Sequence, residues 1–508
     1  MQFINRYSLE RDTDKFIGRY LVLFSMGVIY CFPIWLADRY YNDDLLRSIR
    51  GYADWGDAAR PFTSWLTSIF NFQYPWMAKF HSSVLVDTGP LLQLLAVAIL
   101  AFGATLLGAI ILTQPLRLPT ALVVFPIIGS PFLLENLSYK FDALSMSVGL
   151  TIAIAAAMNI NNRKLDLSIG ILLLVAAYGL YQPSVNVFIG TSALLVLAKL
   201  WNNNVFDGEL AFINIAKFVG ASLIYKFAVV RYFPFGSEYS IMHSQIVAFS
   251  EDGVLAVIRN IRNATAIIAE PFSDVPLFLV FALTSIGVFG VRVTSKGSRR
   301  LLHFGVFVVG TLAILFSTCG ILLVLQTPML SPRAFMGFSV FLVYVFFCVK
   351  VAFEPFKKIS IILLVLPTYY LYFLAFAYGA AAKSQTLYDY QLSASIMQNL
   401  NRLGFEANNI LIFDGIQPMS PVVQNSRRIK FLYRLVPLNM SNQWVWGYLL
   451  MEHQGLRFRR SSSADIRAEI MEICKQEPVW SEQRYKIYRY NRTFVIGFEN
   501  GGCFQGGF

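Results

Sequence analysis

Long runs of apolar residues recur along the first three quarters of the chain, separated by short polar connections. A helix needs about 20 such residues, at 1.5 Å each, to cross a bilayer. The run at 118–133 is short and contains Pro126 and Pro131, so we expect it to be broken or tilted. The pattern predicts eleven spans, at about residues 18–37, 89–112, 118–133, 143–160, 167–181, 184–201, 210–230, 275–292, 301–325, 335–351 and 359–380.

Two shorter amphipathic stretches lie in the long loop 38–88. Asp44 to Trp55 places apolar residues at near-helical spacing, and Thr63 to Phe72 repeats the pattern. Both are typical of helices that lie in the plane of the membrane surface, with aromatic side chains at head-group depth. Residues 253–268 predict a third such helix, which ends near Pro271.

The composition changes at about Lys383, where a polar, mixed sequence begins. At roughly 125 residues this tail is long enough to fold as a small α/β domain. We therefore divide the chain into a transmembrane region, 1–382, and a C-terminal α/β domain, 383–508. The tail predicts helices at Ser393–Gly404 and Asp465–Cys474, a strand at Asn409–Phe413, and a hairpin made of Tyr485–Tyr490 and Thr493–Phe498.

The composition supports an integral membrane protein. Hydrophobic residues make up 56% of the chain and charged residues 14%, with a mean hydropathy of +0.54. A soluble domain carries roughly 25% charged residues. The net charge of +12 is typical of cytoplasmic loops that meet anionic lipid. No basic stripe with interleaved aromatic residues occurs outside the loops that flank the spans, so we expect no nucleic-acid partner.

The short connections indicate which side of the membrane each one faces. Lysine and arginine concentrate in alternate connections, at 6–19, 117, 163–164, 292–300 and 350–358. By the positive-inside rule these connections are cytoplasmic. An odd number of spans then places the amino terminus inside and the tail outside, on the side of the loops that carry most of the unusual polar residues. No cleavage site follows the first span, so we expect it to be retained as an anchor.

The cysteines fall into two groups. Cys31, Cys319 and Cys348 lie in apolar spans and are expected to be packing residues. Cys474 and Cys503 lie in the polar tail. They can form a disulfide if the tail is outside the cytoplasm, and two free thiols are the alternative.

An acidic pair, Asp43-Asp44, directly follows the first span, and Arg47 comes next. A carboxylate at this exit can act as a general base on an acceptor hydroxyl. Partial desolvation by Tyr40 and Tyr41 would raise its pKa toward a useful range. The alternative is structural, with Asp43 as the cap of the next helix and Asp44 paired with Arg47. For the pair as a whole we favour the catalytic interpretation.

The other outer loops supply candidate substrate contacts. Arg60 and Arg333 are suited to grip a phosphate through two parallel hydrogen bonds. The alternatives are a lipid contact for Arg60 and a purely positional role for Arg333. Asp142 has the alternative of capping the next helix while Lys140 neutralises it. The full set of predicted substrate-binding residues is Arg47, Arg60, Asn136, Tyr139, Lys140, Asp142, Tyr181, Gln182 and Arg333.

Several other classes of site have no support in the sequence. The four histidines are far apart and show no metal-ligand spacing, so we predict no metal site. No glycine-rich phosphate loop of the Walker or dinucleotide type is present, which argues against ATP-driven transport. No Gly-x-Ser-x-Gly element occurs either. We expect no cofactor.

Two motifs carry a resemblance to a known family. One is Asn42-Asp-Asp-Leu-x-Arg, followed by Tyr-x-x-Trp and Arg60-Pro. The other is Asn136-Leu-Ser-Tyr-Lys-Phe-Asp-Ala-Leu-Ser-Met-Ser147, and Tyr181-Gln-Pro-Ser184 supports both. With these motifs the chain resembles the bacterial and phage type-specific glucosyltransferases (Gtr) that decorate O-antigen and cause serotype conversion. It departs from the pattern at Ala59, where glycine is expected.

The resemblance implies a polytopic α-helical fold of the GT-C type in the bacterial inner membrane, with the active site and the C-terminal domain in the periplasm. Members similar to this chain take glucose from undecaprenyl-phosphate glucose and attach it to a sugar of the lipid-linked O-antigen of lipopolysaccharide. A catalytic acid in the first outer loop matches Asp43 or Asp44. With a single base and no covalent intermediate, inversion at C1 is expected, and a metal is optional because the leaving group is already a phosphate.

Three rival functions stay open at this point. A flippase or transporter for a lipid-linked sugar would need polar groups near mid-membrane and often two related halves. An O-antigen polymerase would use arginines of the outer loops on a diphosphate donor. A related GT-C enzyme would use another donor sugar, such as aminoarabinose or mannose.

Overall fold

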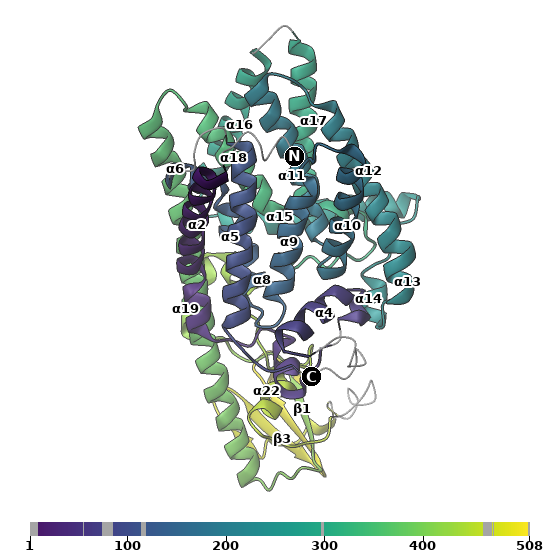
Figure 1. Ribbon diagram of the computed structural model, residues 1–508. Helices are drawn as coiled ribbons and strands as arrows, with labels where there is room; N and C mark the ends of the chain where they lie inside the picture. The colour runs from purple at the N-terminus through teal and green to yellow at the C-terminus, as the bar shows by residue number, and fades with distance from the viewer. Residues whose placement is uncertain are drawn as a thin grey trace. The chain divides into compact units, whose positions relative to one another are not determined.

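The computed structural model describes residues 9–53, 55–73, 85–112, 118–295, 299–460, 470 and 472–505. The chain forms two compact units, and each is described by itself (Figure 1). The first, called here the helical unit, comprises residues 1–33, 53–83 and 87–376. The second, called the sheet unit, comprises residues 34–52, 84–86 and 377–508.

The helical unit is built from apolar helices. Seven of the described helices are long and apolar enough to cross a membrane, at Phe16–Ala37, Leu91–Ile111, Ser184–Asn203, Gly208–Tyr232, Leu277–Ser295, Arg300–Val324 and Lys357–Arg402. Together with the composition, they identify the chain as a membrane protein. The helices labelled in this unit are α4 (Pro61–Phe70), α5 (Leu91–Ile111), α6 (Leu118–Val124), α7 (Pro126–Gly129), α8 (Leu133–Ser138), α9 (Ala143–Ala157), α10 (Arg163–Leu180), α11 (Ser184–Asn203), α12 (Gly208–Ile224), α13 (Val230–Tyr232), α14 (Glu238–Met242), α15 (Glu251–Ala269), α16 (Leu277–Ser295), α17 (Arg300–Cys319) and α18 (Phe338–Ala352).

The predicted break in the run 118–133 is confirmed. The run contains two short helices, α6 and α7, and α8 begins at Leu133. Pro126 is the first residue of α7, a position where the missing N–H costs no hydrogen bond. A proline there starts a helix well but cannot continue the one before it.

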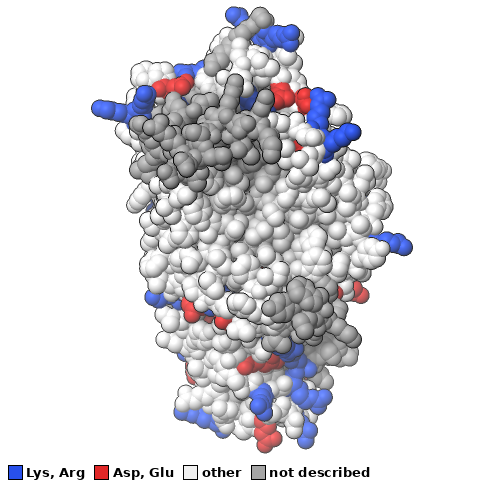
Figure 2. All heavy atoms as spheres, in the orientation of Figure 1, with Lys and Arg blue, Asp and Glu red and all other residues white. Residues whose placement is uncertain are grey.

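Helix α9 lies at the centre of the helical unit, packed against α5, α10 and α11 (Figure 1). Small residues allow this close approach. A Cβ on Gly103 of α5 would lie 2.8 Å from the Thr151 hydroxyl of α9, so only glycine fits there. The outer helices instead expose large apolar side chains, such as Leu172, Phe212 and Leu279. On the face drawn in Figure 2, a broad surface carries almost no charged side chain, as lipid contact requires.

The three amphipathic segments form helices. They are α3 (Asp44–Arg50), which belongs to the sheet unit, and α4 and α15, which belong to the helical unit. The Asn260 side-chain amide of α15 donates to the backbone carbonyls of Leu323 and Leu325, which attaches α15 to that segment. That these helices lie in the plane of the membrane stays a prediction.

The sheet unit contains a four-stranded sheet in the order β1-β4-β3-β2. Strand β1 pairs in parallel with β4, while β3 pairs antiparallel with both β4 and β2. The predicted strand 409–413 and the predicted hairpin are confirmed, with Asn491 in the left-handed conformation at the turn. The elements of this unit are α3, β1 (Ile410–Asp414), α20 (Pro421–Asn425), α21 (Lys430–Leu435), α22 (Trp446–His453), β2 (Trp480–Ser481), β3 (Lys486–Tyr490), β4 (Thr493–Gly497) and α24 (Gly502–Gln505). Most of the predicted helix 465–474 lies outside the described residues.

Two helices contribute residues to both units, α2 (Leu9–Ala37) and α19 (Lys357–Arg402). The sequence predicted that the last span ends near residue 380 and that a separate helix covers 393–404. Instead α19 continues for 46 residues. No proline lies between Pro367 and the end of the helix at Arg402. The stretch 377–402 is also rich in alanine, leucine and glutamine, which favour helix, so nothing ends the helix at the change of composition.

The sheet unit folds around the last part of α19. Leu392, Ile396 and Leu400 of that helix are fully buried against residues of the sheet such as Phe413 and Ile487. Leu45 of α3 belongs to the same core, so the segment after the first span is part of this unit. The unit also carries the disulfide between Cys474 and Cys503, while Cys31, Cys319 and Cys348 are buried free thiols.

Candidate functional site

A buried ion pair joins two of the predicted substrate-binding residues in the helical unit. The Arg60 guanidinium lies 3.1 Å from the Asp142 carboxylate, with the two side chains 12% and 6% exposed. The Trp55 indole N–H donates to the same carboxylate oxygen at 2.8 Å. Arg60 also donates to the Leu180 carbonyl at 2.8 Å. A buried charge pair persists only when such extra hydrogen bonds satisfy it, and here they do.

The two side chains bind each other and do not make the contacts that the structural alternatives describe. Asp142 occupies the position before the first residue of α9, but its side chain makes no capping hydrogen bond. Its carboxylate binds Arg60 and Trp55 instead. Arg60 is nearly buried, which is incompatible with a side chain that reaches along the lipid surface. The Lys140 ammonium lies 3.7 Å from the Asp87 carboxylate.

Tyr181 links the ion pair to a second polar group. The Arg60 guanidinium stacks 4.9 Å from the centre of the Tyr181 ring, and the Tyr181 hydroxyl donates to the Arg333 carbonyl at 3.3 Å. The neighbouring residue, Gln182, donates to the Ala58 carbonyl at 2.8 Å, just before Arg60 in the chain. The turn after α10 thus holds the loop before α4.

The second group centres on Arg333 and Glu135. The Glu135 carboxylate accepts the Arg333 backbone N–H at 2.8 Å and lies 3.8 Å from its guanidinium. Asn136 donates to the Arg333 carbonyl at 3.3 Å. The guanidinium itself stacks 5.1 Å from the centre of the Tyr139 ring and donates to the Met329 sulfur. Glu135, Asn136 and Tyr139 belong to the motif at 136–147 or adjoin it, so this motif positions Arg333.

The two arginines differ in how fully they are engaged. Arg60 binds a carboxylate, a backbone carbonyl and, at 3.4 Å, the Ser145 hydroxyl. Among the described residues, the Arg333 guanidinium has only weak partners, namely a thioether, a ring face and a carboxylate at 3.8 Å. Its side chain is also more exposed, at 21%. Arg333 can therefore bind an anion without giving up a strong hydrogen bond.

The site contains residues that the sequence interpretation did not select. Glu135, Trp55 and Ser145 all contact predicted site residues. Glu135 carried a usable signal, because an acidic residue inside an apolar run is costly unless it has a partner. Trp55 and Ser145 belong to the two motifs quoted above, but their contacts could not be predicted, since these depend on how the loop before α4 folds onto α9.

The acidic pair lies in the sheet unit, where its two members differ. Asp44 is fully buried, and its carboxylate accepts the Tyr41 backbone N–H at 3.1 Å. Asp43 precedes α3 without a capping hydrogen bond. Its side chain is 53% exposed and lies 3.8 Å from the Arg47 guanidinium. The Arg47 guanidinium, proposed above as a possible partner of Asp44, thus also lies beside Asp43. Asp43 is the member of the pair that a substrate can reach.

No metal centre is evident in the described part of the chain. Its one cluster of three close potential ligands comprises Asp414, Cys474 and Cys503. The two cysteines are joined in the disulfide, so their sulfurs are not thiolate ligands.

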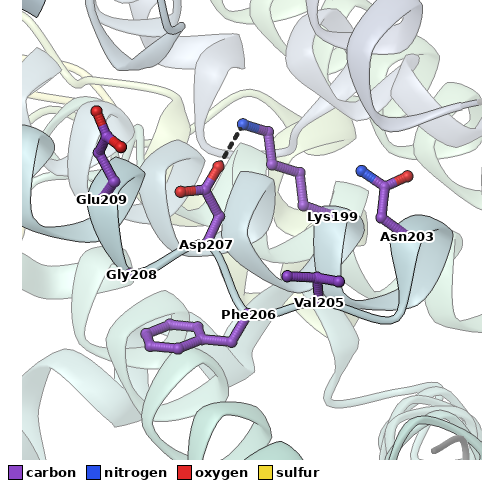
Figure 3. Close-up of a pocket in the computed structure, with 7 residues that line it drawn as sticks. All are labelled: Lys199, Asn203, Val205, Phe206, Asp207, Gly208 and Glu209. Carbon is purple, nitrogen blue, oxygen red and sulfur yellow. Dashed lines mark hydrogen bonds and ion pairs between the residues drawn. The ribbon is translucent and has the colours of Figure 1, made fainter.

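A cavity of about 370 Å³ lies where α11 is followed by α12 (Figure 3). Lys199 and Asp207 point toward each other there and form an ion pair at 2.8 Å. Glu209, which also lines the cavity, pairs with Arg163. None of the predicted site residues lines this cavity, and each of its charged groups forms an ion pair.

Comparison with known proteins indicates the family to which the helical unit is similar. The family model described as "Glucosyl transferase GtrII" matches residues 32–350, which include every predicted site residue. A protein of Salmonella phage P22, described as an uncharacterized 55.3 kDa protein in the gtrB 5' region, is 26% identical over 501 residues. The alignment covers 94% of this chain and 97% of the phage protein. No solved structure matches.

Proposed function

The chain belongs to the GtrII glucosyl transferase family, and from this premise we propose that it transfers glucose from undecaprenyl-phosphate glucose to a sugar of lipid-linked O-antigen. The predicted resemblance to the Gtr enzymes is confirmed by the family match, and membership makes the chain a glycosyltransferase of the membrane. The donor, the acceptor and the stereochemistry are the proposed part.

The observation that carries the proposal is the arrangement of two arginines in the helical unit, Arg60 and Arg333. Transfer of glucose from a polyprenyl phosphate breaks the bond between C1 and the phosphate oxygen, so negative charge grows on the leaving phosphate. Arg333, with its weak partners, is the residue we assign to that phosphate. Preorganised charge of this kind is usually the largest contribution to catalysis.

Arg60 has a different role in this proposal. Its guanidinium is held by Asp142 and by the Leu180 carbonyl, and it stacks on Tyr181, whose hydroxyl binds the backbone of Arg333. Arg60 therefore fixes the position of Arg333 and adds positive charge beside it. Lys140, paired with Asp87, is a third cation in the same unit.

The general base is assigned to Asp43. The acceptor hydroxyl must lose its proton as it attacks C1, and a base has to come within hydrogen-bond distance of that proton. Asp43 has a half-exposed carboxylate, whereas Asp44 is buried and binds the Tyr41 N–H. One base and no covalent intermediate give inversion at C1. No step in this scheme requires a metal.

The proposed architecture is a GT-C type with eleven crossings. The proposal counts the seven long apolar helices, the three shorter ones (Thr120–Gly129, α9 and α18) and α10 as crossings. In this proposal the sheet unit faces the periplasm, and the charge pattern of the connections supports that orientation. The Cys474–Cys503 disulfide supports this, because disulfides persist in oxidising compartments.

Mass analysis of O-antigen tests the function. Polysaccharide from cells that express the protein is compared with polysaccharide from cells that lack it. The proposal predicts one additional hexose per repeat at unchanged chain length. A changed distribution of chain lengths would instead indicate a polymerase, and loss of surface polysaccharide a flippase.

A further inference from the structure

Asp389 of α19 is a buried acid with four side-chain donors, all within the sheet unit. Its carboxylate is 2% exposed and lies 2.8 Å from the Arg39 guanidinium. Gln385 donates to it at 2.7 Å, and Gln417 at 2.5 Å. Asn439 adds a longer hydrogen bond of 3.3 Å. The acid is therefore both charge-paired and saturated with hydrogen bonds, which is the arrangement that makes a buried ion tolerable.

These donors come from segments far apart in the sequence. Gln417 also accepts the Met440 backbone N–H, and Gln385 accepts that of Ser420. Asp389 thus fixes two loops of the C-terminal region, around 417–420 and 437–440. Arg39, the charged donor to Asp389, belongs to the segment that leads to the acidic pair Asp43-Asp44.

Arg39 and Tyr41 together attach this segment to the C-terminal region. Besides Asp389, Arg39 donates to the Pro437 carbonyl at 2.5 Å and to the Thr386 hydroxyl at 3.3 Å. The Tyr41 hydroxyl donates to the Leu435 carbonyl at 3.0 Å. The side chains of Arg39 and Tyr41 are therefore both held by the stretch 435–437.

The backbone of this segment needs such attachment. Asp38 and Asn42 have φ angles of +44° and +47°. That left-handed region costs a non-glycine residue about 1 kcal/mol, even though aspartate and asparagine tolerate it better than most. Such conformations persist where surrounding contacts over-determine them. Here the contacts of Arg39 and Tyr41 lie between the two left-handed residues, directly before Asp43.

We infer that Asp389 is a positioning residue for the transfer reaction: through Arg39 it holds the loop 38–44, and with it the Asp43 carboxylate, in its working conformation. The tail is then a structural component of the catalytic machinery, and its role does not depend on binding the acceptor itself. The inference rests on the proposed function, because the network can affect transfer in this way only if Asp43 is the general base.

Two variants test the network. Asp389→Asn removes the charge opposite Arg39. Arg39→Lys keeps both charges but loses the second hydrogen-bonding arm, so it serves if Asp389→Asn fails to fold. The matched control is Glu472→Gln, which breaks an exposed ion pair with Lys475 in the same unit. Each is made in the full chain, purified in detergent and assayed with lipid-linked glucose. We expect kcat to fall about 10²-fold at nearly unchanged donor KM, as a misplaced group causes, and the control to behave as wild type.

A second readout does not depend on activity. A cysteine is introduced by Asp43→Cys, and its rate of alkylation is measured with and without Asp389→Asn or Arg39→Lys. The three free native cysteines are buried, so they should contribute little to the measured rate. We expect a several-fold change in rate, and none with Glu472→Gln. Unchanged alkylation and unchanged kcat would overturn the inference, as would a loss of kcat with unchanged alkylation. Altered alkylation with full activity would support the positioning and instead contradict Asp43 as the base.

Discussion

Arg60 and Asp142 form a buried ion pair across 3.1 Å, although one residue precedes α4 and the other precedes α9. Each residue stands at the start of a helix, yet neither side chain caps it. The pair instead fastens the long loop after the first span to the central helix of the unit. It therefore connects the two sequence motifs on which the resemblance to glucosyltransferases depends.

Removal of one partner of this pair should be costly. Arg60→Ala leaves the Asp142 carboxylate buried without its cation, and we expect a loss of about 3–5 kcal/mol in stability together with loss of transfer. Thermal unfolding in detergent measures the first and glucosylation in membranes the second. Arg163→Lys, at an ion pair whose arginine is 71% exposed, is the control and should change neither. Wild-type stability of Arg60→Ala would show that the pair contributes little.

Arg333→Lys should separate catalysis from stability. A lysine keeps the charge but cannot present two parallel N–H groups to a phosphate. Because the native guanidinium has weak partners, the fold should tolerate the change. We expect kcat/KM for the lipid-linked donor to fall about 10²–10³-fold, the range for loss of one preorganised donor. An unchanged kcat/KM would remove Arg333 from the phosphate-binding role.

The two members of the acidic pair should respond differently. Asp43→Asn removes the proposed base from a half-exposed position, so transfer should fall about 10²–10⁴-fold while the unfolding temperature stays constant. Asp44→Asn alters a buried group that binds the Tyr41 N–H, so it should lower the unfolding temperature as well. Kinetics and unfolding are measured on the same preparations. Full activity of Asp43→Asn would transfer the role of base to another residue.

Thiol counting tests the environment of the sheet unit. Of the five cysteines, the structure pairs Cys474 with Cys503 and buries the other three. Denatured protein from whole cells, alkylated before any reduction, should therefore carry three labels, and reduction should raise the number to five. Five labels without reduction would place the tail in a reducing compartment and contradict the proposed periplasmic orientation.

Local patterns predicted the elements well, because their causes are local. Two prolines broke the run 118–133, and the turn at Asn491 gave the hairpin. The end of α19 was missed because a change in composition does not by itself stop a helix. The boundary of the sheet unit was not foreseeable either, since Leu45 and Arg39 join it through contacts with residues that lie hundreds of positions later.

In the candidate site too, local sequence patterns predicted some features, and contacts between distant residues decided the others. The motifs pointed to Arg60, Asp142, Tyr181 and Arg333, which the structure brings together within the helical unit. They did not indicate which arginine is engaged and which is available, because that depends on the pairing of Glu135 and on the Leu180 carbonyl. Spacing along the chain identifies candidate groups, and only the folded contacts assign their roles.

The central claim, that a polyprenyl phosphate carries the glucose, is tested most directly by reconstitution. Purified protein in proteoliposomes receives undecaprenyl-phosphate [14C]glucose and lipid-linked O-antigen, and radioactivity in the polysaccharide is measured. The account predicts label in the polysaccharide from this donor, none from UDP-glucose, and a strong reduction with Arg333→Lys. Label that arrives from UDP-glucose, or none from the lipid-linked donor under conditions where the protein is folded, would contradict it.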